Sequence, residues 1–422
     1  MIADRPMRIL IATASRTMIG GIEKYVQVLI PALLARGHAV AMLYEYPCTA
    51  GDVVVDSLEL GLKSWYWDPG RQAALGQEMA DWNPDLVYAH GFESMDLEEF
   101  LLDHFPVVLY AHVYQGTCIT GRKCHAFPAI RPCERHFGPK CLALYYPRRC
   151  GGLNPWKALQ LYQVNVRRNS RRKDYRSIIV ASRHMYDEFL KHDVSSEKLH
   201  LVPLPITGHG PREKPPVPRT IEGRVLFIGR LTDLKGVRNL IEAIPIASNL
   251  LNRPLSLSIA GEGQQRRQLE GLSNRLGVAA NFLGWLDAPG REDAMRQADL
   301  LAVPSLWPEP FGLVGIEAGC FGLPAVGYAV GGIPDWLIPG QTGELAPGDP
   351  PTVEGLAEAM ARALADPEHH ARLSRGAWEL SKQFDTPRHL AMLEPILSAA
   401  VSVKPENREV LVDSLMTREQ SE

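Results

Sequence analysis

The sequence predicts an α/β protein with two Rossmann-like, doubly wound domains that face each other across a cleft. Short apolar runs of strand length alternate with segments of helical periodicity, which is the pattern of a parallel sheet with helices on both faces. The pattern stops where six prolines fall within sixteen residues (203, 205, 211, 215, 216 and 218), because such a stretch builds neither helix nor central strand. It then restarts and continues to about residue 380. Since 422 residues suffice for two domains, we interpret the proline-rich stretch as the linker between them.

This interpretation divides the chain into six segments. In chain order they are an N-terminal domain (1–205) with an insertion (113–155), a linker (206–222), a C-terminal domain (223–383), a helix expected to return to the N-terminal domain (384–402) and a tail (403–422). A cleft between two such domains is a favoured place for a ligand.

The predicted strands are short apolar runs, with helical periodicity between them. In the N-terminal half these runs are 7–12, 40–43, 86–89, 107–110 and 178–180, and in the C-terminal half they are 225–228, 255–260, 281–283, 300–303 and 324–328. The first predicted helix has apolar residues at helical spacing from Ile22 to Leu34, and Gly37 ends it. Further helices are expected from about residues 237, 264, 292 and 312, and over 353–380.

The composition excludes several classes of protein. With 45% hydrophobic and 22% charged residues the chain is typical of globular proteins, and its net charge of −3 provides no global attraction to nucleic acid. No apolar run approaches the roughly 20 residues that span a bilayer, and the N-terminus has no charged-then-apolar signal pattern. We therefore expect a cytoplasmic protein with no nucleic-acid partner.

The segment 300–319, LLAVPSLWPEPFGLVGIEAG, predicts an anion site. A strand leads into a turn that carries Glu309, and Phe311-Gly312 opens a helix on which Glu317 lies. The first amide groups of a helix are unpaired and its dipole is positive there, so a pyrophosphate can dock. Glu309 can then accept hydrogen bonds from sugar hydroxyls, and Glu317 from ribose hydroxyls. The plainer alternative is that Glu309 is a charge at a helix start and Glu317 an exposed helix residue. That interpretation is the weaker one, because two carboxylates in an otherwise apolar segment are costly to bury without partners.

A second cationic element follows the strand at 225–228. Arg230 and Lys235 lie five residues apart at the carboxyl end of that strand, where a doubly wound sheet presents ligands. Such cations can neutralise the charge on a leaving diphosphate. The alternative is a solvated basic turn.

Together these motifs resemble the retaining glycosyltransferases of family four, which have the two-domain GT-B fold. The motifs that carry the resemblance are Gly-Arg-x4-Lys-Gly (229–236), IAGEG (259–263), NFLGWL (281–286), PEPFGLVGIEA (308–318), GGIPDWL (331–337) and TGEL (342–345). In the N-terminal domain the likeness depends on fewer positions, namely Gly20-Gly21, RGHAV (36–40), His112 and Ala181-Ser182. The sequence departs from the family at Pro203-Leu204-Pro205, where the family often has Pro-Asn-Gly.

The resemblance implies a donor site shared by both domains. It implies that Glu309 contacts the transferred sugar with His112 beside it, that Arg230 and Lys235 hold the diphosphate, and that Glu317 holds the ribose. The other donor-binding positions that it implies are Gly20, Gly21, Phe282, Leu283, Gly284, Phe311, Gly312 and Leu313.

The implied activity is transfer of a hexose-type sugar from a nucleotide sugar, expected to be a UDP-sugar, to a glycan or lipid-linked saccharide. No third carboxylate suggests a covalent nucleophile, so the resemblance implies an oxocarbenium-like reaction with retention. No DxD-type acidic pair occurs in the donor motifs, so we expect no catalytic metal. The alternatives are another GT-B enzyme, such as a nucleotide-sugar epimerase or phosphorylase, and a non-catalytic subunit that binds sugar nucleotides.

Five of the seven cysteines lie in the insertion. Cys118, Cys124, Cys133, Cys141 and Cys150 follow the spacing C-x5-C-x8-C-x7-C-x8-C, without the close pairs typical of zinc sites. We predict that four of them hold a structural zinc ion, with His125 or His136 as a substitute ligand and an iron–sulfur cluster less favoured. Independent reduced thiols and a redox-labile disulfide are the alternatives.

The chain is strongly basic between Arg122 and Arg183. This stretch has fifteen Lys and Arg residues and two acids, Glu134 and Asp174. Aromatic and apolar residues precede its densest part, so we predict peripheral contact with a membrane through 156–183. A solvated helix face or a site for a charged acceptor are the alternatives.

Overall fold

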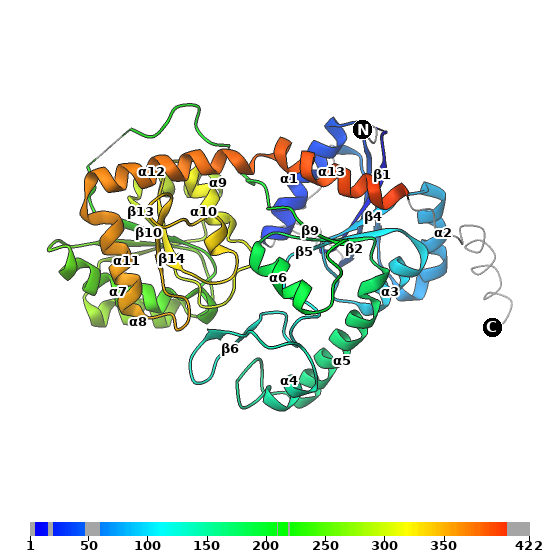
Figure 1. Cartoon of the computed structure of the whole chain (residues 1–422), viewed down its shortest axis with the longest axis horizontal. Helices are drawn as coiled ribbons and strands as arrows, with labels where there is room; N and C mark the ends of the chain where they lie inside the picture. Colours follow the sequence, from blue (N-terminus) through cyan, green and yellow to red (C-terminus); the bar gives the residue numbers. More distant parts are fainter. Residues whose placement is uncertain (1–4, 16–19, 47–59, 209, 218–219, 403–422) are drawn as a thin grey trace.

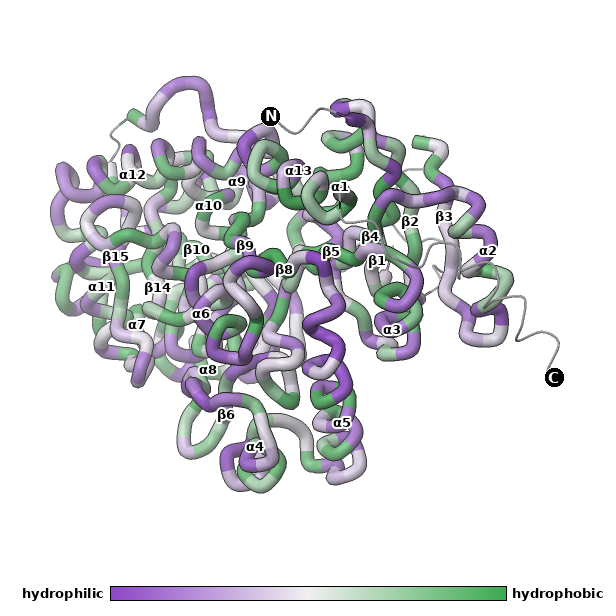
Figure 2. Tube along the Cα trace, turned by 45° about the vertical axis from the view of Figure 1, so that its right-hand side comes forward, coloured by the Kyte–Doolittle hydropathy of each residue, from purple (hydrophilic) through white to green (hydrophobic). Residues whose placement is uncertain are grey.

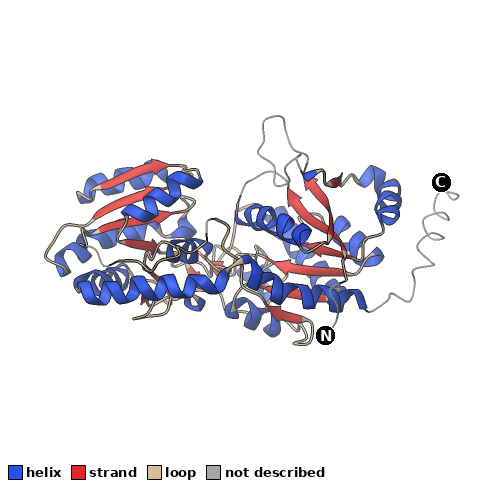
Figure 3. Cartoon of the chain, turned by 90° about the horizontal axis from the view of Figure 1, so that it is seen from above, coloured by secondary structure: helices blue, strands red, loops and turns tan. Residues whose placement is uncertain are grey.

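The computed structural model describes residues 5–15, 20–46, 60–208, 210–217 and 220–402. The chain folds into two halves, each with a parallel sheet between layers of helices (Figures 1 and 3). The predicted fold class is thereby confirmed. In Figure 2 the hydrophobic segments concentrate in the strands at the centre of each half.

The N-terminal sheet has seven strands in the order β3-β2-β1-β4-β5-β8-β9, and all neighbours are parallel. Its strands are β1 (Arg8–Ser15), β2 (Ala39–Tyr46), β3 (Lys63–Tyr66), β4 (Leu86–Ala89), β5 (Val107–Ala111), β8 (Ser177–Val180) and β9 (Leu199–Leu201). The helices of this half are α1 (Gly21–Ala35), α2 (Gln72–Trp82), α3 (Met95–His104), α4 (Pro139–Leu144), α5 (Pro155–Arg171) and α6 (Arg183–Lys191).

The C-terminal sheet has six parallel strands in the order β12-β11-β10-β13-β14-β15. Its strands are β10 (Arg224–Ile228), β11 (Ser256–Ala260), β12 (Ala280–Gly284), β13 (Leu300–Val303), β14 (Ala325–Tyr328) and β15 (Gly343–Ala346). The helices are α7 (Val237–Leu250), α8 (Arg266–Leu276), α9 (Ala288–Gln297), α10 (Leu313–Gly319), α11 (Val353–Ala365), α12 (Pro367–Ser381) and α13 (Thr386–Ser402). In each sheet the strand order reverses beside the first strand, β1 or β10, and ligands of doubly wound sheets bind at that point.

Three strands of the two sheets were missed by the sequence analysis, namely β3, β9 and β15, and in β9, LHL, a histidine interrupts the apolar residues. The β3 sequence, KSWY, has one buried side chain, Trp65, and pairs with β2 at the sheet edge. The β15 sequence, GELA, contains Glu344, whose carboxylate is held by Arg362 and His369. None of the three is a continuous apolar run, so the criterion of apolar runs could not find them.

The chain crosses between the halves twice, and the two crossings touch. The amide of Ile206, after β9, donates a hydrogen bond of 2.8 Å to the carbonyl of Phe384, between α12 and α13. Helix α13 then packs against α1, β4 and β5 of the N-terminal half. Figure 1 shows α12 and α13 running along one side of the molecule from one half to the other. The amide–carbonyl bond therefore joins the linker and the returning segment at the hinge.

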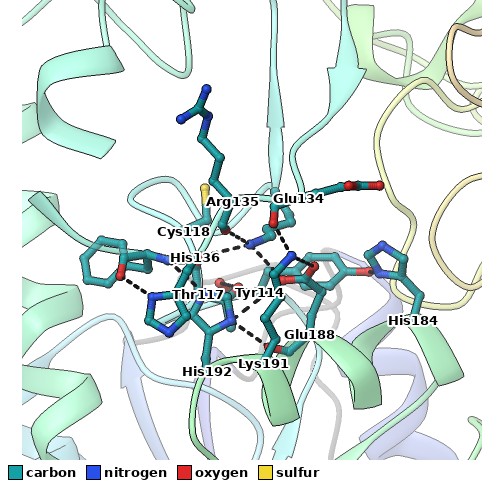
Figure 4. A network of polar contacts seen from close by, with 12 residues as sticks. Tyr114, Thr117, Cys118, Glu134, Arg135, His136, His184, Glu188, Lys191 and His192 are labelled. Atoms are coloured by element: carbon teal, nitrogen blue, oxygen red, sulfur yellow. Dashed lines mark hydrogen bonds and ion pairs between the residues drawn. The ribbon is translucent and has the colours of Figure 1, made fainter. Parts of the chain in front are cut away.

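The insertion is anchored by a small apolar core and by a buried ion pair. Its core consists of Ile119, Phe137 and Tyr145 together with Ala158 of α5. The Lys123 ammonium is 1% exposed and lies 2.7 Å from the carboxylate of Glu188 on α6. It also donates hydrogen bonds to two carbonyls of the insertion. Figure 4 shows this network between the insertion and α6.

Candidate active site

The carboxylate of Glu309 is held firmly at the carboxyl edge of the C-terminal sheet. Lys235 Nζ lies 2.5 Å from Glu309 Oε1, and the same oxygen accepts hydrogen bonds from Ser305 Oγ (2.6 Å) and Trp307 Nε1 (3.0 Å). Glu309 is 5% exposed. Burial works against its ionisation, but the Lys235 charge and the three hydrogen bonds outweigh burial and keep its pKa below the usual value. Because every described partner uses Oε1, the second oxygen is left for a ligand.

The backbone around Glu309 requires glycine at two positions. Gly236, just after Lys235, has φ +66°, and a Cβ there would lie 1.9 Å from the carbonyl oxygen of Pro304. Gly312, with φ +91°, immediately precedes α10 and packs against the indole of Trp336. Trp336 Nε1 donates a 2.7 Å hydrogen bond to the carbonyl of Phe311. The GGIPDWL segment therefore supports the Phe-Gly turn that leads into Leu313 and α10.

Glu317 has protein partners in addition to the predicted ribose. Thr207 Oγ1, from the linker, donates a 2.6 Å hydrogen bond to one carboxylate oxygen, and Arg291 of α9 pairs with the other. Lys24 of α1 is close by, and burial together with the Arg291 charge lowers its pKa. The carboxylate that is expected to hold the ribose therefore also joins the linker and α9 to α10.

We expect Glu317→Ala to raise the donor KM more than it lowers kcat. Its carboxylate shares no described partner with that of Glu309, and it would contact the donor in the ground state and the transition state alike. Calorimetric titration of the donor measures the effect, and unchanged affinity would contradict the ribose role. Thr207→Val is the control, because it removes only the hydroxyl bonded to the carboxylate.

The remaining positions that were predicted to bind the donor in the C-terminal half are spread along its edge. Arg230 is exposed and has no side-chain partner among the residues that the structure describes. Phe282, Leu283 and Gly284 end the edge strand β12, where Arg266 donates to the Phe282 carbonyl at 3.4 Å. Arg230 is thus free to meet an anionic ligand.

The start of α1 brings the N-terminal half against α10. The amide of Gly20 donates a 2.7 Å hydrogen bond to Glu23, which fixes the start of the helix. A Cβ on Gly21 would lie 4.0 Å from Leu313 Cδ1, so backbone from one domain reaches the helix of the other. The preceding residues, 16–19, lie outside the described part of the chain.

His112 follows β5 and belongs to a cluster of histidine and tyrosine side chains. Its Nε2 lies 3.1 Å from His90 Nδ1, and its ring stacks on Tyr110 with centroids 4.7 Å apart. The surrounding protein lowers the pKa of His112 to about 3, because burial disfavours the charged ring, and that of His90 falls well below its usual value for the same reason. Both rings are therefore neutral near pH 7. His112 can position a sugar hydroxyl but carries no charge to offer a phosphate.

The cluster continues to the returning helix. The hydroxyl of Tyr25 on α1 lies 2.9 Å from that of Tyr88 and 2.7 Å from Nε2 of His389 on α13. The sequence analysis missed Tyr25, His90 and His389. His90 carries a signal that could have found it, since it follows β4 as His112 follows β5.

A cavity of about 140 Å³ opens beside His112 at the carboxyl ends of β1, β4 and β5. Thr13, His90 and Gln115 line it, and Glu98 and Arg168 form part of its wall. In a doubly wound sheet this edge faces the ligand crevice. The N-terminal half therefore offers a small cavity next to the histidine pair, with a mostly apolar lining and a few polar side chains.

The five cysteines of the insertion are free thiols. Cys124 is buried, and the other four are partly exposed. Burial, followed by the neighbouring cysteines, raises the pKa of Cys150 to about 12. Over the described residues no three His, Cys, Asp or Glu side chains are arranged to hold a metal ion. The thiols are neighbours, but their present positions do not form a ready-made site.

Half of the cations in the densest part of the basic stretch, three of the six in 167–176, are neutralised by acids of the protein. On α5, Arg167 pairs with Glu99, Arg168 with Glu98, and Arg171 with Asp103, all three acids belonging to α3. Figure 2 shows the hydrophilic C-terminal part of α5. This part of 156–183 thus joins two helices and is not an unpaired cationic face. None of the helices that the structure describes is long and apolar enough to cross a membrane.

Comparison with known proteins identifies the family. A model for glycosyltransferase family 4 matches residues 19–207, and a model for glycosyl transferases group 1 matches residues 213–379. Glycogen synthase from Mycobacterium tuberculosis is 29% identical over 404 residues, covering 87% of this chain and 88% of its own. Phosphatidyl-myo-inositol mannosyltransferase from the same organism is 36% identical over 138 residues, covering 32% and 35%.

Solved structures show the same fold. Anabaena HepE, in complex with UDP and glucose, superposes with a TM-score of 0.66 at 19% identity over 93% of this chain and 100% of its own. Sucrose-phosphate synthase from Thermosynechococcus elongatus gives 0.68 at 20% identity over 92% and 98%. The two family models, one in each half, together with this fold show that the chain is a family-four glycosyltransferase of the GT-B type.

Proposed function

We propose that this glycosyltransferase transfers a hexose from a UDP-sugar to a glycan or lipid-linked saccharide, with retention of the anomeric configuration. The observation that carries the proposal is the Glu309 carboxylate, anchored through one oxygen by Lys235, Ser305 and Trp307. An anchored carboxylate with a second oxygen available can hold a sugar hydroxyl in a fixed orientation. The choice of UDP is supported by Anabaena HepE, which was solved with UDP and glucose.

The charges around Glu309 suit departure of a diphosphate. In this proposal Lys235 bridges Glu309 and the leaving group, and the exposed Arg230 provides a second cation. The neutral His112 orients a sugar hydroxyl from the opposite domain. The departing phosphate accepts the proton of the acceptor hydroxyl on the same face, which gives retention without a covalent intermediate.

The donor can be identified by thermal unfolding. A ligand that binds only the folded state raises Tm, by an amount that corresponds to about 2.7 kcal/mol at a hundred times its Kd. We expect UDP-hexoses to raise Tm more than GDP- or ADP-hexoses. Preference for GDP or ADP would reject the UDP assignment, and no shift with any nucleotide sugar would count against donor binding. The anomeric configuration of the product, read by NMR, tests retention.

We also propose that the insertion holds one structural zinc ion through four of Cys118, Cys124, Cys133, Cys141 and Cys150. Thiolates are suitable zinc ligands, but the described positions would have to shift to coordinate it. No catalytic step depends on this ion. We expect close to one equivalent of zinc by elemental analysis of protein purified without a histidine tag, and loss of insertion structure on chelation. Below about a tenth of an equivalent of zinc or iron, with five titratable thiols in the insertion, the proposal fails.

We place the enzyme in the cytoplasm, with peripheral contact to a membrane.

A further inference from the structure

The tip of the insertion exposes two large apolar side chains on a rigid element. Leu153 is 83% exposed and Trp156 is 77% exposed. They flank the start of α5, where the Asn154 side chain accepts hydrogen bonds from the amides of Trp156 (3.0 Å) and Lys157 (3.2 Å). Pro155 occupies the first helical position, which further fixes the backbone. Exposing a tryptophan and a leucine together in water is unfavourable, and such patches mark interaction sites.

Two cations line a hollow with Leu153, and a third precedes Leu153 by four residues in the sequence. Arg122 and Lys157 line, together with Leu153, a hollow of about 240 Å³. Arg149 lies over the ring of Phe127, 5.3 Å from its centroid. None of these three cations pairs with a carboxylate within the described ranges, unlike the arginines at the other end of α5. The surface therefore combines apolar and cationic character.

Acidic side chains are nearly absent from this region. Between Arg122 and Arg183 the chain has two, and Asp174 is paired with Arg171 at the far end of α5. The net charge of −3 does not oppose the local positive field, because charges separated by more than about 10 Å are screened at 0.1 M salt. An anionic surface would meet a positive patch here.

We propose that this tip, formed by Arg122 and residues 149–157, docks on an anionic lipid surface. Trp156 and Leu153 would enter the region between headgroups and acyl chains, while Arg122, Arg149 and Lys157 meet lipid phosphates. Figure 1 shows α4 and the start of α5 at the edge of the molecule away from α12 and α13. Between Trp156 and Arg168, which borders the His112 cavity, α5 rises about 18 Å. Docking thus holds the cavity near the membrane.

This docking surface replaces the one expected from composition. The basic run 167–172 has more charges, but they are used within the fold, whereas the tip has fewer charges and leaves them available. A second copy of the chain is the competing occupant. It would have to bring acidic groups to the tip, and its presence would appear as dimerisation through Trp156 in the absence of lipid.

Vesicle flotation of the full chain tests the proposal. The probes are vesicles of phosphatidylcholine alone and with 30 mol% phosphatidylglycerol, at low and at 0.5 M salt. We expect binding only to the anionic vesicles, weakened at high salt. Leu153→Ser with Trp156→Ser should reduce the partition coefficient at least tenfold, and Arg122→Gln with Lys157→Gln should reduce it severalfold with a weaker salt dependence.

Two matched variants serve as controls. Trp285, in the C-terminal half, is 76% exposed, so Trp285→Ser removes an equally exposed indole and should leave vesicle binding unchanged. Arg167→Gln with Arg171→Gln removes two charges that are already paired and should also have little effect. Circular dichroism confirms that each variant is folded.

The proposal is overturned if wild type ignores anionic vesicles or if the Leu153/Trp156 variant binds as wild type does. It is also overturned if Trp285→Ser or the Arg167/Arg171 variant causes the larger loss. Sedimentation equilibrium gives a further test: a lipid-independent dimer that Trp156→Ser dissociates would assign the tip to a second copy of the chain.

Discussion

Glu309→Ala is expected to lower kcat at least a hundredfold, which corresponds to about 3 kcal/mol of lost transition-state stabilisation. The substitution removes the carboxylate that would orient the sugar, and it also frees Lys235, whose ammonium is then no longer fixed beside the leaving group. Preorganised charges of this kind typically contribute an effect of this size. Steady-state kinetics with the identified donor measures it.

Two further variants separate the charge of Glu309 from its shape. Glu309→Gln keeps the side-chain volume and the hydrogen bond from Ser305, and should still lose most of the activity because its attraction to Lys235 is gone. Glu270→Ala is the control, since this half-exposed carboxylate on α8 pairs with Arg266 and with no other cation in the described ranges. Wild-type turnover in folded Glu309→Ala would reject the catalytic role.

Lys123→Ala is expected to destabilise the N-terminal half by about 3–5 kcal/mol. The ammonium is 1% exposed and pairs with the Glu188 carboxylate at 2.7 Å, while donating to the carbonyls of Thr117 and Arg135. Its removal leaves one buried negative charge and two carbonyls without their donor (Figure 4). The loss of unfolding free energy is measured by denaturant unfolding, with a spectroscopic signal from the N-terminal half. Proteolysis of the insertion gives a second measure.

Lys191 provides a matched control for this prediction. It lies 3.5 Å from the same Glu188 carboxylate, but its side chain is 39% exposed, so Lys191→Ala should cost at most about 1 kcal/mol. Replacing the buried pair by Lys123→Met with Glu188→Leu should recover most of the stability, because no buried charge remains unpaired. Equal effects of Lys123→Ala and Lys191→Ala would show that the buried pair does not anchor the insertion.

The fold class and the donor motifs could be predicted because their information is local. A strand that is buried on both faces must be a short apolar run, and the order of β10, β13 and α10 follows from the order of such runs. Gly236 and Gly312 are local as well, since their positive φ angles leave few residues besides glycine at these positions. Glu309 could be singled out because an acid beside apolar strands is costly unless it has a partner.

The partners themselves were decided only by the tertiary structure. Glu309 meets Lys235 across 74 positions and Glu317 meets Thr207 across 110, separations that no local pattern encodes. Tyr25 and His389 are 364 positions apart and touch only because α13 returns to the N-terminal half.

The same distinction explains the basic stretch and the insertion. The sequence alone determined that 122–183 is cationic, but it did not determine which of these charges would be left unpaired on the surface. Helix α3 lies beside α5 and neutralises the arginines near its C-terminal end, and no such acidic neighbour reaches Arg122 or Lys157 in the described structure. The number of charges is a property of the sequence. The electrostatic free energy of each charged side chain depends on its distance to the opposite charge and on its burial. Only the fold sets those two quantities.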